Sequence, residues 1–283
     1  MSVDILLSKQ NRDGGWPYVR GASWTEPTVY SVLALHAAGE NGPAGRGLDW
    51  LRARQLSDGG WPPQTGFDES NWVTALVALL PPGLLGAPAH ARAIQWLLGV
   101  TGEESTAIFR LRRWLLGESP PRPEPAGWPW VRGTAAWVVP TSLALLALDK
   151  ENLRQPSPFI TSRIADGRRF LLERMCVNGG WNHGAVRVYG IEGVPYPETT
   201  GVALAAVRGV RSPATDRAVA VASAFLKDCR SIDALNWLRM GLMAHGQLPT
   251  GYEPPQLPYR TLMETSLDML VAETRKGREI LWS

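Results

Sequence analysis

The sequence has few cysteines, no long apolar run and little net charge, and each shortage argues against a class of protein. Its two cysteines, Cys176 and Cys229, are too few for a disulfide framework. The longest apolar stretch, residues 135–148, falls short of the ~20 residues that span a bilayer. The net charge is +3, without a long basic stripe, which argues against nucleic acid as a partner. The first ten residues are too short and too charged for a signal peptide, so we expect a cytoplasmic protein.

Tryptophan is abundant, and its spacing reveals an internal repeat. The chain has 13 tryptophans in 283 residues. Residues 15–21 read Gly-Trp-Pro-Tyr-Val-Arg-Gly and residues 127–133 read Gly-Trp-Pro-Trp-Val-Arg-Gly; both lead through a Trp to Pro-Thr and then Leu-Ala-Leu. Weaker copies begin at residues 55–62 and 178–181, and a decayed copy at 250–252. A repeat of this length is typical of an architecture built from stacked units.

Each copy contains an amphipathic helix, a glycine turn, a Pro/Thr start signal and a second, almost wholly apolar helix. Helices that are apolar all round must be buried, whereas amphipathic ones can face water. The alternation predicts an all-α fold, an α/α toroid of about five to six inner/outer helix pairs, with residues 1–283 as a single domain. We expect inner helices near 26–38, 70–80, 139–149, 198–209, 232–245 and 264–274, and outer helices near 2–10, 44–55, 90–100, 161–176 and 212–229. Segment 104–118 fits neither ring and is predicted to be an insertion, followed by a proline-rich loop at 120–125.

The pattern Q-x-x-D-G-G-W at Gln10–Trp16 and Gln55–Trp61 resembles the QW repeat of squalene–hopene and oxidosqualene cyclases. The resemblance places the chain with the terpenoid cyclase and protein prenyltransferase toroids. It implies that these Gln and Trp residues join an outer helix to the next inner one, and that a central cavity binds an isoprenoid or another long apolar ligand. The chain departs from those cyclases in having length for only one such domain and in lacking D-x-D-D-T-A, whose central Asp protonates an alkene.

Two glutamates are the candidate acids. The Thr of the D-x-D-D-T-A motif can be aligned with Thr200 or Thr28 of this chain. Glu198 and Glu26 then lie two residues before the aligned Thr. A carboxyl inside an apolar cavity has a raised pKa and can donate a proton. The alternative is that each glutamate only complements the positive end of its helix. In the second strong copy Val139 replaces Glu26, so the repeat itself does not require a carboxylate there.

Aromatic and basic residues supply the candidate ligand contacts. Five aromatics lie at the start of, or within, the predicted inner helices, where they either stabilise a cation or fill the core: Trp24, Tyr30, Trp72, Trp137 and Trp237. Arg20 and Arg132 occupy matching loop positions and either bind a diphosphate or pair with a neighbouring carboxylate.

Neither a metal nor another cofactor is expected. The four histidines are scattered through the sequence without metal-ligand spacing. Asp228, Cys229 and His245 invite comparison with the zinc ligands of prenyltransferases, but their spacing differs from that family's.

Several functions remain open at this point. One is a protonation-initiated (class II) terpene cyclase or isomerase that uses Glu198 or Glu26. The others are a non-catalytic toroid that binds a partner protein and a prenyltransferase-like subunit. The apolar loop 81–86 also leaves peripheral membrane contact open.

Overall fold

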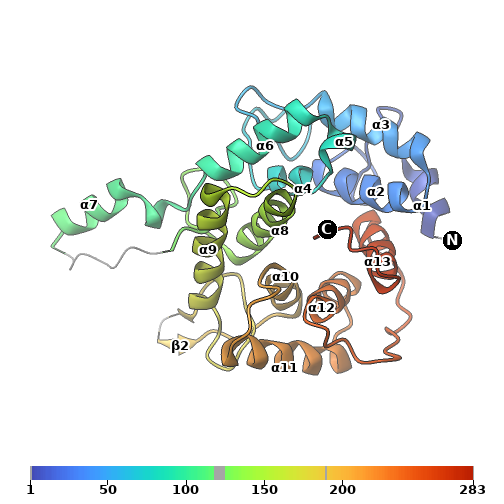
Figure 1. The fold of residues 1–283 in the computed structure, drawn as a ribbon. Coiled ribbons are helices and arrows are strands. Elements are labelled where there is room, and N and C mark those ends of the chain that lie inside the picture. The colour runs from blue at the N-terminus through green and yellow to red at the C-terminus, as the bar shows by residue number, and fades with distance from the viewer. Residues whose placement is uncertain (1, 118–124, 189, 283) are drawn as a thin grey trace.

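The chain folds into two concentric rings of helices (Figure 1). A computed structural model describes residues 2–117, 125–188 and 190–282. Within them the inner ring consists of α2 (Thr25–Ala37), α4 (Val73–Ala78), α8 (Val138–Arg154), α10 (Pro197–Ala206), α12 (Ile232–Ala244) and α13 (Leu262–Arg275). The outer ring consists of α1 (Ser2–Lys9), α3 (Asn41–Arg52), α6 (Ala87–Gly99), α9 (Pro158–Glu173) and α11 (Pro213–Asp228). The predicted α/α toroid is confirmed.

The inner helices are largely buried, as their composition requires, and α2, α4 and α10 are buried most completely. Every residue of α10 from Thr199 to Ala206 is buried, for example. The ring closes where α13 packs against α2: the hydroxyls of Ser31 and Ser266 lie 3.2 Å apart. Nearby, the backbone N–H of Leu262 donates to the carbonyl of Tyr18 at 2.8 Å. Each inner helix thus contacts an inner neighbour on both sides.

The tryptophan of each glycine turn joins an outer helix to the next inner helix. The Trp61 indole donates to the carbonyl of Leu51 in α3 at 2.8 Å, while its backbone N–H donates to the Thr74 hydroxyl in α4 at 2.9 Å. Gln55 adds two bonds to carbonyls, those of Gly59 and Ala89. The same pair of bonds recurs at Trp16 (Leu6, Thr28), Trp128 (Leu97, Thr141) and Trp181 (Leu171, Thr200). These fully buried tryptophans are therefore structural.

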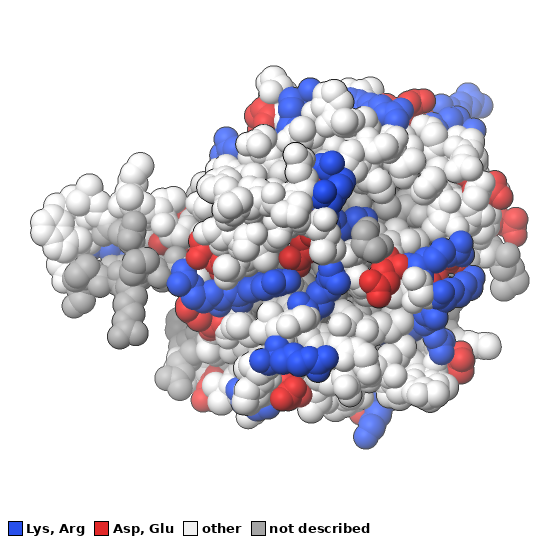
Figure 2. All heavy atoms as spheres, viewed as in Figure 1, with Lys and Arg blue, Asp and Glu red and all other residues white. Residues whose placement is uncertain are grey.

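Segment 103–117 projects away from the rings (Figure 1), in keeping with its prediction as an insertion. It carries a short 3₁₀ turn, Glu103–Ser105, and helix α7 (Ala107–Leu115), and in Figure 2 the visible side of this arm carries few charges. The proline-rich run predicted to be a loop lies outside the described residues, apart from its last residue. A small antiparallel hairpin, β1 (Arg187–Val188) with β2 (Ile191–Glu192), interrupts the connection between α9 and α10.

The apolar loop 81–86, for which the sequence left peripheral membrane contact open, packs onto the body of the protein through part of its length. It forms the short helix α5 (Pro82–Leu85), in which Leu85 is buried. The guanidinium of Arg52 in α3 donates to the carbonyls of Leu84 and Leu85. Across the described residues, no helix combines the length and apolar character needed to cross a bilayer.

Candidate active site

The first two turns of the inner helices enclose a cavity of about 200 Å³ at one end of the toroid. Its upper layer comes from the second residue after the N-cap in α2, α8, α10, α12 and α13, and from the N-cap residue of α4: Glu26, Val139, Glu198, Asp233, Met263 and Trp72. Residues four apart on a helix share a face. The second layer accordingly lies one turn deeper, at Tyr30, Leu143, Val202 and Trp237.

Three carboxyl groups meet in this cavity: Glu26 on α2, Glu198 on α10 and Asp233 on α12. Two of these helices touch backbone to backbone. A Cβ added at Gly201 of α10 would lie 2.3 Å from the carbonyl carbon of Trp237 in α12. Only glycine permits this approach, which brings Glu198 near enough to act electrostatically on Asp233.

The carboxyl of Asp233 has a strongly raised pKa. Burial raises the pKa of its carboxyl to about 7, and the negative charges of Glu264 and Glu198 add to the effect. Among the described residues, no hydrogen-bond partner reaches its Oδ1 atom, which is fully shielded from solvent. Near pH 7 this group is therefore poised to give or take a proton.

Glu26 has a similar pKa but a different setting. Burial raises the pKa of this carboxyl to about 7; the hydrogen bond from the Tyr18 hydroxyl opposes that rise, and the charge of Asp233 adds to it. The Tyr18 bond favours the ionised form of Glu26 and fixes its orientation. Glu26 and Asp233 influence each other, so they titrate as a pair near neutral pH.

Glu264, in the first turn of α13, has a structural role. Its carboxylate accepts hydrogen bonds from the backbone N–H groups of Arg260 and Thr261, the latter at 3.2 Å, and completes a capping box at the start of α13. Its residue is only 7 % exposed. The group acts on the site through its charge alone.

Aromatic rings form the remaining walls. Trp72 and Trp130 meet edge to face with ring centroids 4.9 Å apart, and Tyr30 and Trp237 do so at 6.5 Å. Flat apolar rings beside carboxyl groups can stack against a ligand ring while the carboxyl groups act on its polar substituents.

Five residues of this cavity were among the site residues predicted from the sequence: Glu26, Tyr30, Trp72, Glu198 and Trp237. Trp130 and Asp233 were missed. Trp130 aligns with Tyr18 in the strong repeat pair, so the alignment could have found it. Asp233 starts an inner helix that has no tryptophan turn before it; the available signal was Ser231, two residues earlier, whose hydroxyl caps α12.

The other predicted contact residues lie outside the cavity lining. Trp24 packs against Tyr18, with ring centroids 5.5 Å apart, and so supports the tyrosine that holds Glu26. Trp137 is 39 % exposed and lies beside His183 at a separate hollow. Arg20 and Arg132 are both exposed, and Arg132 lies over the Trp96 ring of outer helix α6 at 5.8 Å, because the loop carries it away from the axis.

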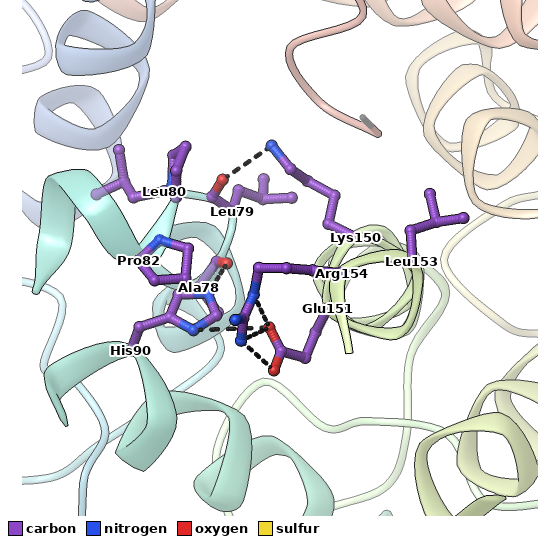
Figure 3. Close-up of a pocket in the computed structure, with 10 residues that line it drawn as sticks. Ala78, Leu79, Leu80, Pro82, His90, Lys150, Glu151, Leu153 and Arg154 are labelled. Carbon is purple, nitrogen blue, oxygen red and sulfur yellow. Dashed lines mark hydrogen bonds and ion pairs between the residues drawn. The ribbon is translucent and has the colours of Figure 1, made fainter. Parts of the chain in front are cut away.

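A second cavity, of about 320 Å³, lies at the opposite end of the inner helices (Figure 3). Its polar groups bind one another: Arg154 pairs with Glu151 at 2.6 Å, and His90 contacts the carbonyl of Ala78 at 3.2 Å. Lys150 donates to the carbonyls of Leu79 and Ile280, which fastens the C-terminal segment across this end (Figures 1 and 3). In Figure 2 acidic and basic side chains lie close together over this face. The polar groups of the second cavity therefore have a structural role, joining the helix ends to the C-terminal segment.

The described residues contain no cluster of three or more His, Cys, Asp or Glu that is suited to hold a metal ion. The residues compared with a zinc site make other contacts. The imidazole of His245 bonds the carbonyl of Leu204 at 3.0 Å, and the Cys229 thiol donates to the carbonyl of Ser231 at 3.7 Å.

Several solved structures with a similar arrangement of helices are described as glycosidases. The chain is similar to a GH8 endo-β-1,4-glucanase from an Achatina fulica gut metagenomic library, with a TM-score of 0.61, 14% identity and coverage of 98% of both chains. It is also similar to an α-amylase from Clostridium perfringens (TM-score 0.59, 12% identity, 100% of this chain and 89% of the other). A protein from Actinoplanes matches with a TM-score of 0.54 and 19% identity over 100% and 81%. No protein-family model matches the sequence, and no curated protein does.

These likenesses correct the predicted family and ligand. The matched folds belong to glycosidases, so the predictions of a squalene–hopene-cyclase-like protein, of a class II terpene cyclase or isomerase, and of an isoprenoid or polyene ligand are wrong. The prenyltransferase-like subunit and the toroid scaffold for a partner protein do not fit them either. The tryptophan repeat determines the double ring of helices. It does not determine the activity, because one fold can support unrelated chemical reactions. The cavity agrees with this correction, because three carboxyls in about 200 Å³ suit a compact polar ligand better than a long polyene. At these identities the likeness shows the fold and not the activity.

Proposed function

We propose that this protein is a glycoside hydrolase that cleaves a glycosidic bond in the cavity between α2, α10 and α12. The observation that carries the proposal is the carboxyl pair Glu26 and Asp233, both with a pKa of about 7, inside an aromatic-walled cavity. Hydrolysis of a glycosidic bond requires two such groups, one protonated and one ionised. The toroid shared with glycosidases supports the proposal at the level of fold.

The size of the cavity agrees with a sugar ring. An apolar cavity of ~150 Å³ accommodates a benzene ring, so about 200 Å³ leaves room for one saturated six-membered ring with its hydroxyls. Trp72, Trp130 and Trp237 offer apolar faces, and the carboxyls offer hydrogen-bond acceptors to the hydroxyls.

The environments of the two carboxyls assign their roles. Asp233 has an oxygen without a donor, so its protonated form is the stable one and it acts as the general acid. Glu26 accepts a hydrogen bond from Tyr18 that favours its ionised form, so it acts as the general base. Asp233 gives its proton to the glycosidic oxygen as the C–O bond breaks. A water molecule adds to the anomeric carbon and passes its proton to Glu26, and the pair then exchanges protons with solvent.

The test is hydrolysis of a panel of aryl glycosides, neutral oligosaccharides and glucosamine oligosaccharides, measured as the release of reducing ends. The wild-type protein is expected to cleave at least one of them. Asp233→Asn and Glu26→Gln should each lower kcat/KM by about 10²–10⁴-fold, the usual contribution of a general acid or base. Glu69→Gln, at an exposed loop position, serves as the matched control and should leave the rate unchanged. Unaltered rates in both cavity variants, or no cleavage of any glycoside, would refute the proposal.

The single-domain organisation and the cytoplasmic location expected from the sequence stay predictions. Fractionation of cells that express the tagged chain would test the location directly.

A further inference from the structure

The cavity contains one more carboxyl than the reaction uses. Glu26 and Asp233 suffice for acid and base, yet Glu198 also lines the cavity, from the same position of its own helix. Among the described residues no hydrogen bond reaches the Glu198 carboxyl, whereas Glu264 is fully engaged in capping α13. Glu198 is therefore available to a ligand.

No positive charge offsets these three acids inside the cavity. Its lining contains no Lys, Arg or His; the other eight residues are aromatic or aliphatic. The nearest buried guanidinium on α12, that of Arg239, is paired with Asp268 of α13 at 2.8 Å. Asp233 lines the same space, and its buried Oδ1 atom has no hydrogen-bond donor among the described residues.

Carboxylates together with aromatic faces form the usual environment of a bound organic cation. A cation is attracted by the negative face of Trp or Tyr and by carboxylate charge, and both attractions strengthen where water is excluded. The same cavity repels an anion and provides nothing to neutralise one. Uronic acids and phosphorylated or sulfated sugars are therefore excluded on charge.

We infer that the ring bound in this cavity carries a free amino group, and that Glu198 pairs with the ammonium of an amine-bearing sugar. This inference rests on the proposed function and names the substrate class for the same site. An acetyl group on the nitrogen would remove the charge and enlarge the substituent, so N-acetylated and neutral sugars bind more weakly.

The test compares three monosaccharides that differ only at C2: glucosamine, glucose and N-acetylglucosamine. Binding to the full-length protein is measured at pH 6, where the amine is protonated, through quenching of tryptophan fluorescence and by calorimetry. The inference predicts that glucosamine binds at least tenfold more tightly than the other two. Equal affinities, tighter binding of glucose, or no binding of glucosamine would overturn it.

Variants then locate the charge that discriminates. Glu198→Gln keeps the shape of the side chain and should reduce the glucosamine-to-glucose affinity ratio to near one, while Glu69→Gln should preserve the ratio. A ratio that survives in Glu198→Gln would overturn the assignment to this residue. The wild-type comparison needs no variant, so it decides the matter even if Glu198→Gln fails to fold.

The two proposals fail separately. Hydrolysis of neutral glycosides without preference for glucosamine would leave the glycoside hydrolase and remove the amine-bearing substrate. Selective binding of glucosamine without hydrolysis of glucosamine oligosaccharides or any other glycoside would do the reverse.

Discussion

Replacing Asp233 with Asn should stabilise the protein while it lowers the proposed activity. Folding moves the pKa of this carboxyl from an ordinary value of 3.8 to about 7, chiefly through burial. Since each pH unit of such a shift corresponds to about 1.4 kcal/mol, ionised Asp233 lowers the free energy of unfolding by about 4 kcal/mol. The helix dipole offers the carboxylate ~0.3–1 kcal/mol in return, and an amide loses most of that. We expect a net gain of about 3 kcal/mol for Asp233→Asn above pH 7.

The sign of the pH dependence follows from the direction of the shift. Between pH 4 and 7 the native carboxyl keeps a proton that the unfolded chain has released, so stability falls as the pH rises through this window. Below pH 4 both states are protonated, and the wild-type protein and Asp233→Asn should be similarly stable. The advantage of the variant should grow from pH 4 to 7 and then stay level.

Urea unfolding, followed by circular dichroism at pH 4, 6 and 8, measures this difference. The control is Asp216→Asn, which removes an exposed carboxyl in the first turn of outer helix α11 and should show no comparable growth with pH. The reasoning fails if Asp233→Asn is no more stable than wild type at pH 8, or if its gain is the same at all three values.

Three further predictions concern the ring and the chemistry. Gly201→Ala should unfold at lower temperature and lose ligand binding, because the new methyl group would force α10 away from α12. The control is Gly45→Ala in α3, where open space surrounds the glycine, and this variant should be neutral or stabilising by up to ~1 kcal/mol. Equal melting temperatures of the two variants would contradict the packing argument. Trp61→Phe should cost at least about 1–3 kcal/mol in urea unfolding, because the buried carbonyl of Leu51 loses its donor; an unchanged midpoint would show that this bond is dispensable. The pH profile of kcat/KM should be bell-shaped around pH 7, since the carboxyl pair must share one proton, and a flat profile between pH 5 and 9 would exclude that pair.

The architecture could be predicted from the sequence because short sequence motifs determine how its helices are joined. Each tryptophan turn recurs with its threonine partner, and those two residues make the bonds that join neighbouring rings. A helix that is apolar on every side must be buried, so α8 and α10 could be assigned to the inner ring from the sequence alone.

The site could be predicted only in part. Glu26 and Glu198 precede the repeat threonine by two residues, and the structure shows why this spacing matters: that position faces the axis. Asp233 was not predicted as a site residue because α12 lacks the tryptophan turn and the threonine that mark the clear copies of the repeat. Its pKa depends on neighbours contributed by α10 and α13, which no local pattern contains.

The predicted chemistry was wrong for a related reason. The tryptophan repeat reports how two rings of helices are joined, and nothing in it describes what the rings enclose. The cavity has a small volume and is lined by three acidic residues and no basic one. Both properties arise only where the N-terminal ends of six helices come together in the fold. Those quantities point away from a polyene and toward a small polar ring.

The account depends most on two cavity carboxyls, Glu26 and Asp233, that both titrate near pH 7 and share one proton there. A carbon-13 NMR titration of the side-chain carboxyls, with Asp233→Asn and Glu26→Gln used for assignment, measures this directly. Two resonances should titrate near pH 7, and one should disappear in each variant while the other moves to a lower pH in Asp233→Asn, as the charge of its neighbour is removed. If every carboxyl of the native protein titrates below about pH 5, the cavity holds no acid at neutral pH and the proposed catalysis is contradicted.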